Sequence, residues 1–214
     1  MNFLGVYKMD KENLIQFESL VAEKFNNAEI KAPIHLYYNN EQQIQKVFER
    51  VDVKNDWVCC TWRNHYQCLL KGVPPDELLS KIVEGKSMVM NLNEYKIVCS
   101  SIVGGIPSIA VGIAESIKRK EEDSKVWCWL GDMSAETGAF HEAYKYSVNH
   151  NLPITFVVED NGLSVTTPTD LIWGRDKPWY ISNVANWVEQ PNLIYYKYTN
   201  TKYPHAGAGR RIQF

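Results

Sequence analysis

Two oxygen-bearing side chains stand where they could bind a metal ion together. Asp132 follows the apolar run 125–130, and Asn161 follows a second apolar run at 152–158. The segment between them, 134–150, has helical spacing, so the unit is interpreted as strand, helix, strand. Adjacent parallel strands present their carboxyl ends at one edge of a sheet, so we expect Asp132 and Asn161 to converge. Two oxygen ligands beside a helix N-terminus suit a magnesium ion that carries a diphosphate.

The elements that must position these side chains are predicted from apolar periodicity and capping residues. Helices are expected at 9–25, 41–50, 75–84 and 104–120, and further strands at 58–61 and 193–198. Residues 85–101 are expected to be irregular, and residues 168–178 to form a loop. The alternation of strands and helices predicts an α/β protein with a mostly parallel sheet.

Composition restricts the class of protein. The 214 residues are expected to form a single domain, 1–214, with a full core and no need of disulfides, and with a flexible tail at 199–214. A net charge of −2 without a basic stripe argues against a nucleic-acid partner. No secretion leader or membrane-spanning run is recognised, and the five cysteines lack ligand-like spacing, so a cytoplasmic protein is expected.

The stretches 131–143 and 159–168 resemble the thiamine-diphosphate motif, which opens Gly-Asp-Gly and closes Asn-Asn. The chain is similar to the alpha subunit of the thiamine-diphosphate-dependent 2-oxo acid dehydrogenases, in a short version. The resemblance implies that family's fold, a three-layer, doubly wound, mostly parallel sheet. It also implies thiamine diphosphate and Mg²⁺ as cofactors. The metal ligands would be Asp132, the side chain of Asn161 and the backbone carbonyl of Leu163.

Two further segments resemble cofactor-binding motifs of the same family. Trp62 and Arg63 match the start of its Tyr-Arg-x-His segment, which implies that Arg63 contacts the diphosphate and that Trp62 replaces the tyrosine. From residue type alone, Arg63 could equally be a surface ion-pair residue. The segment from Ser101 to Val103 resembles part of the family's Gly-Ile-Val-Gly sequence. The resemblance implies that Val103 forms an apolar wedge under the bent cofactor, whereas by itself it is an ordinary core valine.

Two histidines are candidate catalytic residues by resemblance. His35 begins a segment similar to the family's His-Leu-x-x-Gly-Gln-Glu, whose histidine lies in the active-site funnel. His205 lies in a tail similar to the family's Tyr-Arg-x-x-Gly-His, although it is closer to Asn161 than the family's spacing allows. Histidine titrates near neutrality, so either residue could hold or deliver a proton at a reacting carbonyl. The alternative for His35 is a residue satisfied by the local backbone.

The chain departs from the family pattern at two informative positions. Met133 stands at the second glycine of Gly-Asp-Gly, where the backbone amides of Met133 and Ser134 would approach the diphosphate. A right-handed backbone would accommodate the methionine with its side chain pointing away. Val89 stands where the family has an active-site histidine. This second difference concerns substrate specificity more than cofactor binding.

The resemblance implies an enzyme subunit that acts on a 2-oxo acid by oxidative decarboxylation and acyl transfer. No residue here takes the place of the glutamate that activates the cofactor in this family. A beta-type partner is therefore expected, in an assembly of two alpha and two beta chains. Half of a split transketolase acting on a ketose, and a non-catalytic scaffold that retains the fold, remain as alternatives. A magnesium-dependent phosphatase is disfavoured, because Ser134 occupies the position of the second acid it would need.

Overall fold

The centre of the molecule is a six-stranded sheet in the order β2-β1-β3-β4-β8-β7. The computed structural model describes residues 9–174, 178–181 and 185–209. The strands of the sheet are β1 (Trp57–Cys60), β2 (Ile97–Cys99), β3 (Val126–Gly131), β4 (Ile154–Asp160), β7 (Trp187–Gln190) and β8 (Leu193–Lys197). All neighbours pair in parallel except β7, which runs antiparallel to β8. The predicted α/β class with a mostly parallel sheet is confirmed.

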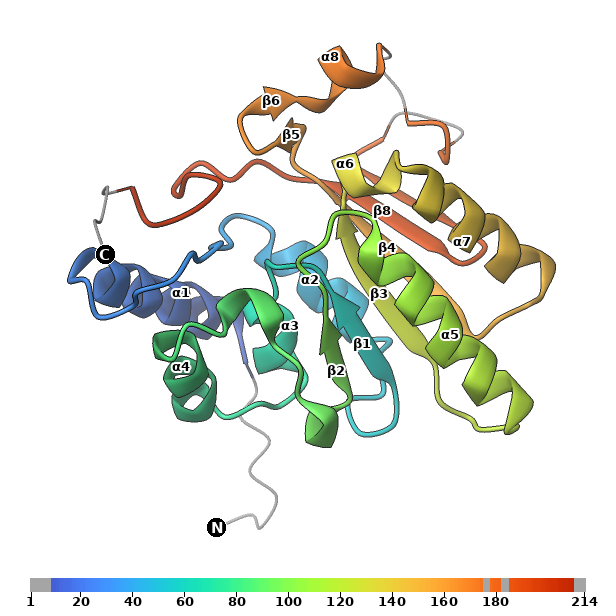
Figure 1. Cartoon of the computed structure of the whole chain (residues 1–214), viewed down its shortest axis with the longest axis horizontal. Coiled ribbons are helices and arrows are strands. Elements are labelled where there is room, and N and C mark those ends of the chain that lie inside the picture. Colours follow the sequence, from blue (N-terminus) through green and yellow to red (C-terminus); the bar gives the residue numbers. More distant parts are fainter. Residues whose placement is uncertain (1–8, 175–177, 182–184, 210–214) are drawn as a thin grey trace.

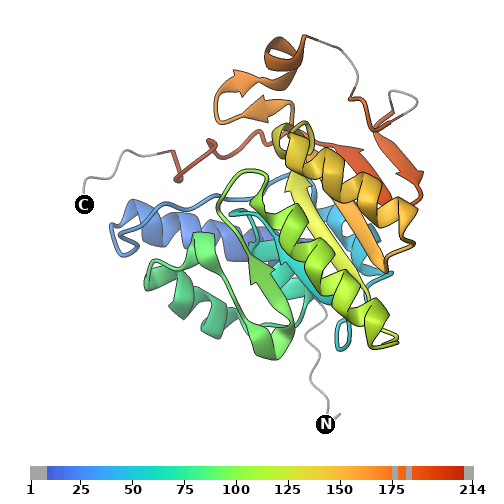
Figure 2. The same cartoon turned by 45° about the vertical axis from the view of Figure 1, so that its right-hand side comes forward.

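Helices cover both faces of this sheet, which gives the three layers expected of a doubly wound fold (Figures 1 and 2). One face is covered by α5 (Gly105–Arg119) and α7 (Gly138–Asn149). The opposite core is shared by α1 (Lys11–Asn26), α2 (Glu41–Phe48), α3 (His65–Leu70) and α4 (Pro75–Val83).

The side chains of β3 alternate between the two cores. Trp127 and Trp129 enter the core beneath α1–α4, whereas Cys128 and Leu130 enter the core beneath α5 and α7. Both faces of the strand are therefore buried. This explains why β3 has a continuous apolar sequence and no alternation of apolar and polar residues.

Most of the predicted elements are confirmed, and three regions differ from the prediction. The expected helix at 134–150 is two helices, α6 (Asp132–Ala135) and α7, because the Thr137 hydroxyl caps α7 by accepting a hydrogen bond from the backbone N–H of Phe140 at 3.3 Å. Strand β2 and two 3₁₀ turns, η1 (Ser87–Val89) and η2 (Asn93–Tyr95), occupy the region expected to be irregular. The expected loop after position 168 contains α8 (Thr169–Trp173).

A small hairpin extends from the carboxyl end of the sheet. Its strands β5 (Leu163–Ser164) and β6 (Thr167–Pro168) lead into α8, above the ends of β3 and β4 in Figure 1. Farther along, the backbone N–H of Gly207 donates to the carbonyl of Ile34 at 2.8 Å.

The ends of the expected domain are only partly described. Residues 1–8 of the domain and 210–214 of the expected flexible tail lie outside the described residues. Within the part of the chain that is described, none of the helices has the length and apolar character needed to cross a membrane.

Candidate functional site

One pocket, open to solvent, lies where the carboxyl ends of β1, β3 and β4 meet. In the register of β3 and β4, Gly131 pairs with Glu159, so the residues that follow each strand emerge side by side. The residues predicted from the sequence that line this pocket are Trp62, Arg63, Val103, Asp132, Met133, Ser134, Asn161, Leu163 and His205. Two predicted residues, His35 and Ser101, do not line it.

Asp132 begins α6 and is almost fully buried. Its carboxylate accepts a hydrogen bond from the hydroxyl of Thr169, the first residue of α8. Burial, together with the nearby carboxylate of Asp160, raises the pKa of Asp132 to about 7. A cation bound at this point would offset both effects, so the electrostatic environment of Asp132 fits a metal ligand.

The turn after β4 is held by two bonds from side chains to backbone. The Asp160 carboxylate accepts from the N–H of Gly162 at 2.8 Å, and the Asn161 side-chain oxygen accepts from the N–H of Leu163 at 3.0 Å. Gly162 has a φ of 70°, a left-handed conformation that favours glycine. The turn thus points Asn161 and Leu163 into the same pocket as Asp132.

The donor set around Asp132 suits a cation that also receives oxygens from a ligand. Among residues 9–174, 178–181 and 185–209, no group of three or more histidine, cysteine or acidic side chains could hold a metal ion. A divalent ion at this pocket would therefore have at most two such side chains as ligands, together with amide and carbonyl oxygens. Its remaining ligands would come from phosphate groups or water, which is how Mg²⁺ is usually bound.

Arg63 presents a guanidinium group with few protein partners to the pocket. Its Nη1 is 3.4 Å from the Tyr198 hydroxyl and its Nη2 is 3.4 Å from the carbonyl of His205, both long distances. Its buried Nε has no hydrogen-bond partner in the described part of the chain. No carboxylate of those residues lies within 4.0 Å of it. A planar fork of donors without an anionic partner fits a phosphate group.

Glu159 lines the pocket and was not among the predicted site residues. Its buried carboxylate accepts from the Tyr37 hydroxyl at 2.6 Å, from Asn40 Nδ2 at 3.2 Å and from the Tyr196 hydroxyl. Burial raises its pKa to about 7. The one sequence signal that could have identified Glu159 is strand alternation, because it turns the side chains of Glu159 and Asp160 to opposite faces of the sheet.

The two predicted catalytic histidines pack against each other, one lining the pocket and one behind it. Their ring centroids are 4.9 Å apart, and the His35 ring also lies 5.8 Å from the Trp62 ring. His205 lines the pocket, whereas His35 is buried behind it and its Nδ1 has no partner among the described residues. Burial and the charge of Arg63 lower the pKa of His35 to about 3, so its ring is neutral near pH 7. The catalytic role of either histidine stays a prediction, and the geometry favours His205.

The loop after β2 and the start of α6 account for the remaining positions. Val103 is 52% exposed and lines the pocket. Gly104 has a φ of 74°, a left-handed conformation that favours glycine, and a Cβ there would make a tight contact of 3.1 Å with the Thr137 hydroxyl oxygen. Met133 has the helical backbone that was expected, and its sulfur accepts a hydrogen bond from Trp173 Nε1 at 3.1 Å. Val89 is exposed and does not line the pocket.

Comparisons with known proteins point to one family. The family model described as "Dehydrogenase E1 component" matches residues 9–175. The alpha subunit of acetoin:2,6-dichlorophenolindophenol oxidoreductase from Bacillus subtilis is 30% identical over 162 residues, which cover 71% of this chain and 48% of that subunit. The pyruvate dehydrogenase E1 component subunit alpha of Porphyra purpurea is 31% identical over 165 residues, which cover 68% of this chain and 47% of that subunit. The chain thus spans about half the length of these curated relatives.

A solved structure from Mycobacterium smegmatis, described as a candidate thiamin diphosphate-dependent enzyme, is also similar. It has a TM-score of 0.43 and 18% identity, and the match covers 63% of this chain and 22% of that one. This structural similarity is too low to support any assignment beyond the one that the sequence matches give.

Proposed function

Because the chain belongs to the dehydrogenase E1 component family, we propose that it is the alpha-type, diphosphate-binding subunit of a thiamine-diphosphate-dependent enzyme. The observation that carries the proposal is the meeting of Asp132, Asn161 and the guanidinium of Arg63 at one pocket. A buried carboxylate that favours a cation and an arginine without an anionic partner complement a magnesium diphosphate.

The pocket residues that the sequence analysis identified have proposed roles. Asp132, Asn161 and the carbonyl of Leu163 hold Mg²⁺, and Arg63 binds the diphosphate. The backbone amides of Met133 and Ser134 lie at the start of α6, where N–H groups are available to phosphate oxygens. Thiamine diphosphate, when bound, would supply an electron sink for negative charge at the carbonyl carbon of the substrate.

At the mouth of the pocket, Val103 supports the rings of the cofactor, and Trp62 and His205 line the path of the substrate. His205 holds or delivers a proton at the reacting carbonyl. Ser101 lies outside the pocket, so we propose no direct contact between its side chain and the cofactor.

We propose a 2-oxo acid as the substrate, with oxidative decarboxylation and acyl transfer as the reaction. A beta-type subunit would complete the site, in an assembly of two alpha and two beta chains. The proposal of a partner subunit is supported by the apolar surface beside the pocket, where Ile102 is 71% exposed and Leu171 is 74% exposed. Burial of such side chains by a partner is favourable. The described cysteines are all free and buried, which suits the reducing cytoplasm that we propose as the compartment.

Calorimetry of the purified chain, alone and with its partner, tests the proposal directly. Thiamine diphosphate should bind only with Mg²⁺, and Asp132→Ala should weaken binding at least about 100-fold, since it leaves a bound cation without its carboxylate. Asp123→Ala, at an exposed acidic residue, is the matched control and should bind as the wild type does. Absence of binding in both preparations would favour the non-catalytic scaffold.

A transketolase-like transfer of a two-carbon unit is the second candidate. It stays open because Val89 stands where the dehydrogenases are expected to have a histidine, which weakens the choice between the two reactions. With the partner present, turnover of a 2-oxo acid supports the first candidate. Turnover of a ketose donor with an aldose acceptor supports the second.

A further inference from the structure

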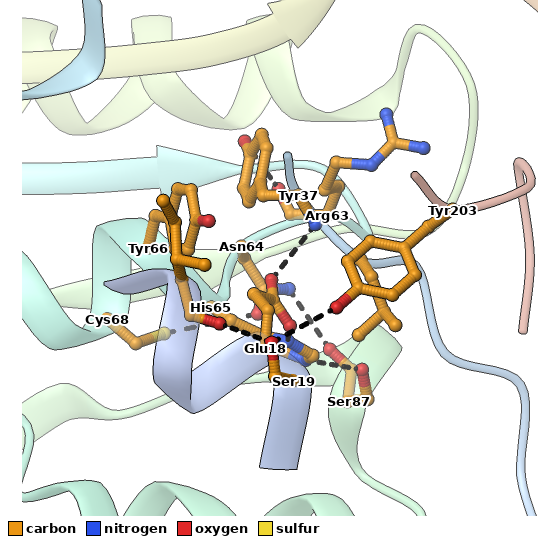
Figure 3. Close-up of polar contacts among 12 residues, drawn as sticks. Glu18, Ser19, Tyr37, Arg63, Asn64, His65, Tyr66, Cys68, Ser87 and Tyr203 are labelled. Atoms are coloured by element: carbon orange, nitrogen blue, oxygen red, sulfur yellow. Dashed lines mark hydrogen bonds and ion pairs between the residues drawn. The ribbon is translucent and has the colours of Figure 1, made fainter. Parts of the chain in front are cut away.

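A buried polar network lies directly behind Arg63 and has no part in the cofactor contacts proposed above. His65 begins α3, with its Nδ1 3.0 Å from Glu18 Oε2 and its Nε2 2.8 Å from Ser87 Oγ (Figure 3). Glu18 lies on α1, and Ser87 begins η1. The exposed fractions of Glu18, His65 and Ser87 are 1%, 0% and 0%. A serine, a histidine and an acid in this order can form a nucleophilic site, but here no substrate reaches the serine.

Asn64 and His65, the two residues that follow Arg63 in the chain, both form hydrogen bonds with Ser87. Asn64 Nδ2 lies 3.1 Å from the carbonyl of Ser87 and 3.1 Å from the carbonyl of Thr61. His65 bonds the hydroxyl of the same serine. Ser87 therefore holds the chain immediately after Arg63 through its carbonyl and through its hydroxyl.

Glu18 extends the network to the other side of Arg63. Its Oε1 accepts from the backbone N–H of Tyr37 at 3.0 Å. The Tyr37 hydroxyl lies 3.1 Å from the carbonyl of Arg63 and 2.6 Å from the Glu159 carboxylate in the pocket. The Tyr37 hydroxyl has one hydrogen, and the Glu159 carboxylate is its nearer acceptor. The backbone of Arg63 is thus held mainly from η1 through Asn64 and His65, and Glu18 holds His65 and Tyr37 on either side of it.

The side chain of Arg63, by contrast, has little to hold it. Its hydrogen bonds through Nη1 and Nη2 are both 3.4 Å long, and its Nε has none among the described residues. The guanidinium carbon also lies 5.8 Å from the centre of the Tyr37 ring. In Figure 3 the guanidinium points away from the network. Its location relative to the pocket therefore depends on where the backbone of Arg63 is held.

We propose that the Glu18–His65–Ser87 network positions the guanidinium of Arg63 for the diphosphate, which makes these three residues positioning residues. The proposal rests on the function proposed above. Displacement of a binding group by about 1 Å can cost orders of magnitude in function, so buried bonds that fix a loop can affect affinity without touching the ligand. Each such bond contributes a modest factor by itself.

Ser87→Ala is the sharpest test, because it removes one hydroxyl and creates only a small cavity. It should weaken the affinity for magnesium thiamine diphosphate, and for magnesium pyrophosphate, by about three- to tenfold in calorimetry. Ser147→Ala is the matched control: Ser147 is equally buried, its hydroxyl has no partner among the described residues, and affinity should change less than about twofold.

Glu18→Gln separates geometry from charge. The amide can accept from the N–H of Tyr37 and donate to Nδ1 of His65, if the imidazole carries its proton on Nε2 and donates it to Ser87. Every bond of the network is then kept without the negative charge. This variant should bind within about threefold of the wild type, whereas Glu18→Ala, which loses both bonds, should bind more weakly than Ser87→Ala.

A double-mutant cycle with Arg63→Ala decides whether the network acts through Arg63. In the Arg63→Ala background, Ser87→Ala should have no further effect on affinity. An undiminished effect in that background, or an unchanged affinity in the single variant, overturns the proposal.

Hydrogen exchange at the amides of 61–66 in the ligand-free chain is a readout that does not depend on binding. Ser87→Ala should speed exchange there, and Ser147→Ala should not. Faster exchange with unchanged affinity would make the network purely structural. Failure of the proposed function has a different signature: the wild type does not bind, or Arg63→Ala binds as tightly as the wild type.

Discussion

Arg63→Ala should weaken the binding of magnesium thiamine diphosphate without destabilising the ligand-free chain. The guanidinium has no carboxylate within 4.0 Å among the described residues, and its Nε has no partner there. Burial by itself would lower the pKa of Arg63, but Tyr198, Tyr37, Glu159 and Glu18 raise it overall, so the guanidinium is charged in the free chain. A bound diphosphate would add a direct anionic partner, so the side chain should contribute more to the complex than to the free chain.

The magnitude follows from the bonds that the guanidinium can make. Hydrogen bonds to charged groups contribute about 1.5–3 kcal/mol, which corresponds to a loss of about 10- to 150-fold in affinity for Arg63→Ala. The two hydrogen bonds of Arg63 are long and go to neutral oxygens, and its guanidinium carbon lies 5.8 Å from the centre of the Tyr37 ring. The free energy of unfolding should therefore stay within about 1 kcal/mol of the wild type. Arg63→Lys keeps the charge but loses the fork of donors, so its affinity for the ligand should lie between those of the wild type and Arg63→Ala.

Calorimetry and urea unfolding of the same preparations provide the assay. Arg50→Ala is the control: Arg50 is half exposed and pairs with Glu189 at 3.0 Å, so its loss should change stability by less than about 1 kcal/mol and leave affinity unchanged. If Arg63→Ala lowers the unfolding midpoint as much as a core substitution does, the guanidinium is structural. If affinity is unchanged, Arg63 does not contact the diphosphate.

Three further predictions concern stability and the site. Asp56→Ala should destabilise the chain by about 3 kcal/mol in urea unfolding, because the buried carboxylate accepts from Trp127 Nε1 and from two backbone N–H groups. His35, whose pKa falls from 6.5 to about 3 on burial, takes up a proton in the unfolded chain that the folded chain excludes, so stability falls as the pH drops below 6.5. His35→Gln should remove roughly 2 kcal/mol of the loss between pH 7 and pH 5, and equal losses in the two proteins would contradict the buried neutral state. Met133→Gly should lower the free energy of unfolding by about 1 kcal/mol in thermal unfolding, because glycine has a lower helix propensity and the hydrogen bond from Trp173 is lost. Its affinity for the ligand in calorimetry should change less than about threefold. A gain in affinity larger than this would mean that Met133 obstructs the ligand.

The sequence by itself determined the central strands of the sheet and the positions of Asp132 and Asn161 after two of them. Strands β3 and β4 are buried on both faces, and such strands are continuous apolar runs with no need of partner information. Asp132 and Asn161 follow those runs directly. Since neighbouring parallel strands end at one edge, their meeting at a pocket could be inferred from local pattern alone.

Local pattern could not predict elements whose surroundings are set by distant segments. Helix α3 is buried on almost every side, so it shows no amphipathic period that would reveal it. Strand β7 is a short edge strand whose pairing depends on β8.

Only the tertiary structure decided the partners of the site residues. Glu159 receives its bonds from Tyr37 and Tyr196, Arg63 is left without a carboxylate, and His35 lies behind His205. Each of these facts depends on contacts between residues remote in sequence. Burial and hydrogen-bond partners set the charge state and reach of a side chain, and no periodicity along the chain records which remote residues supply them.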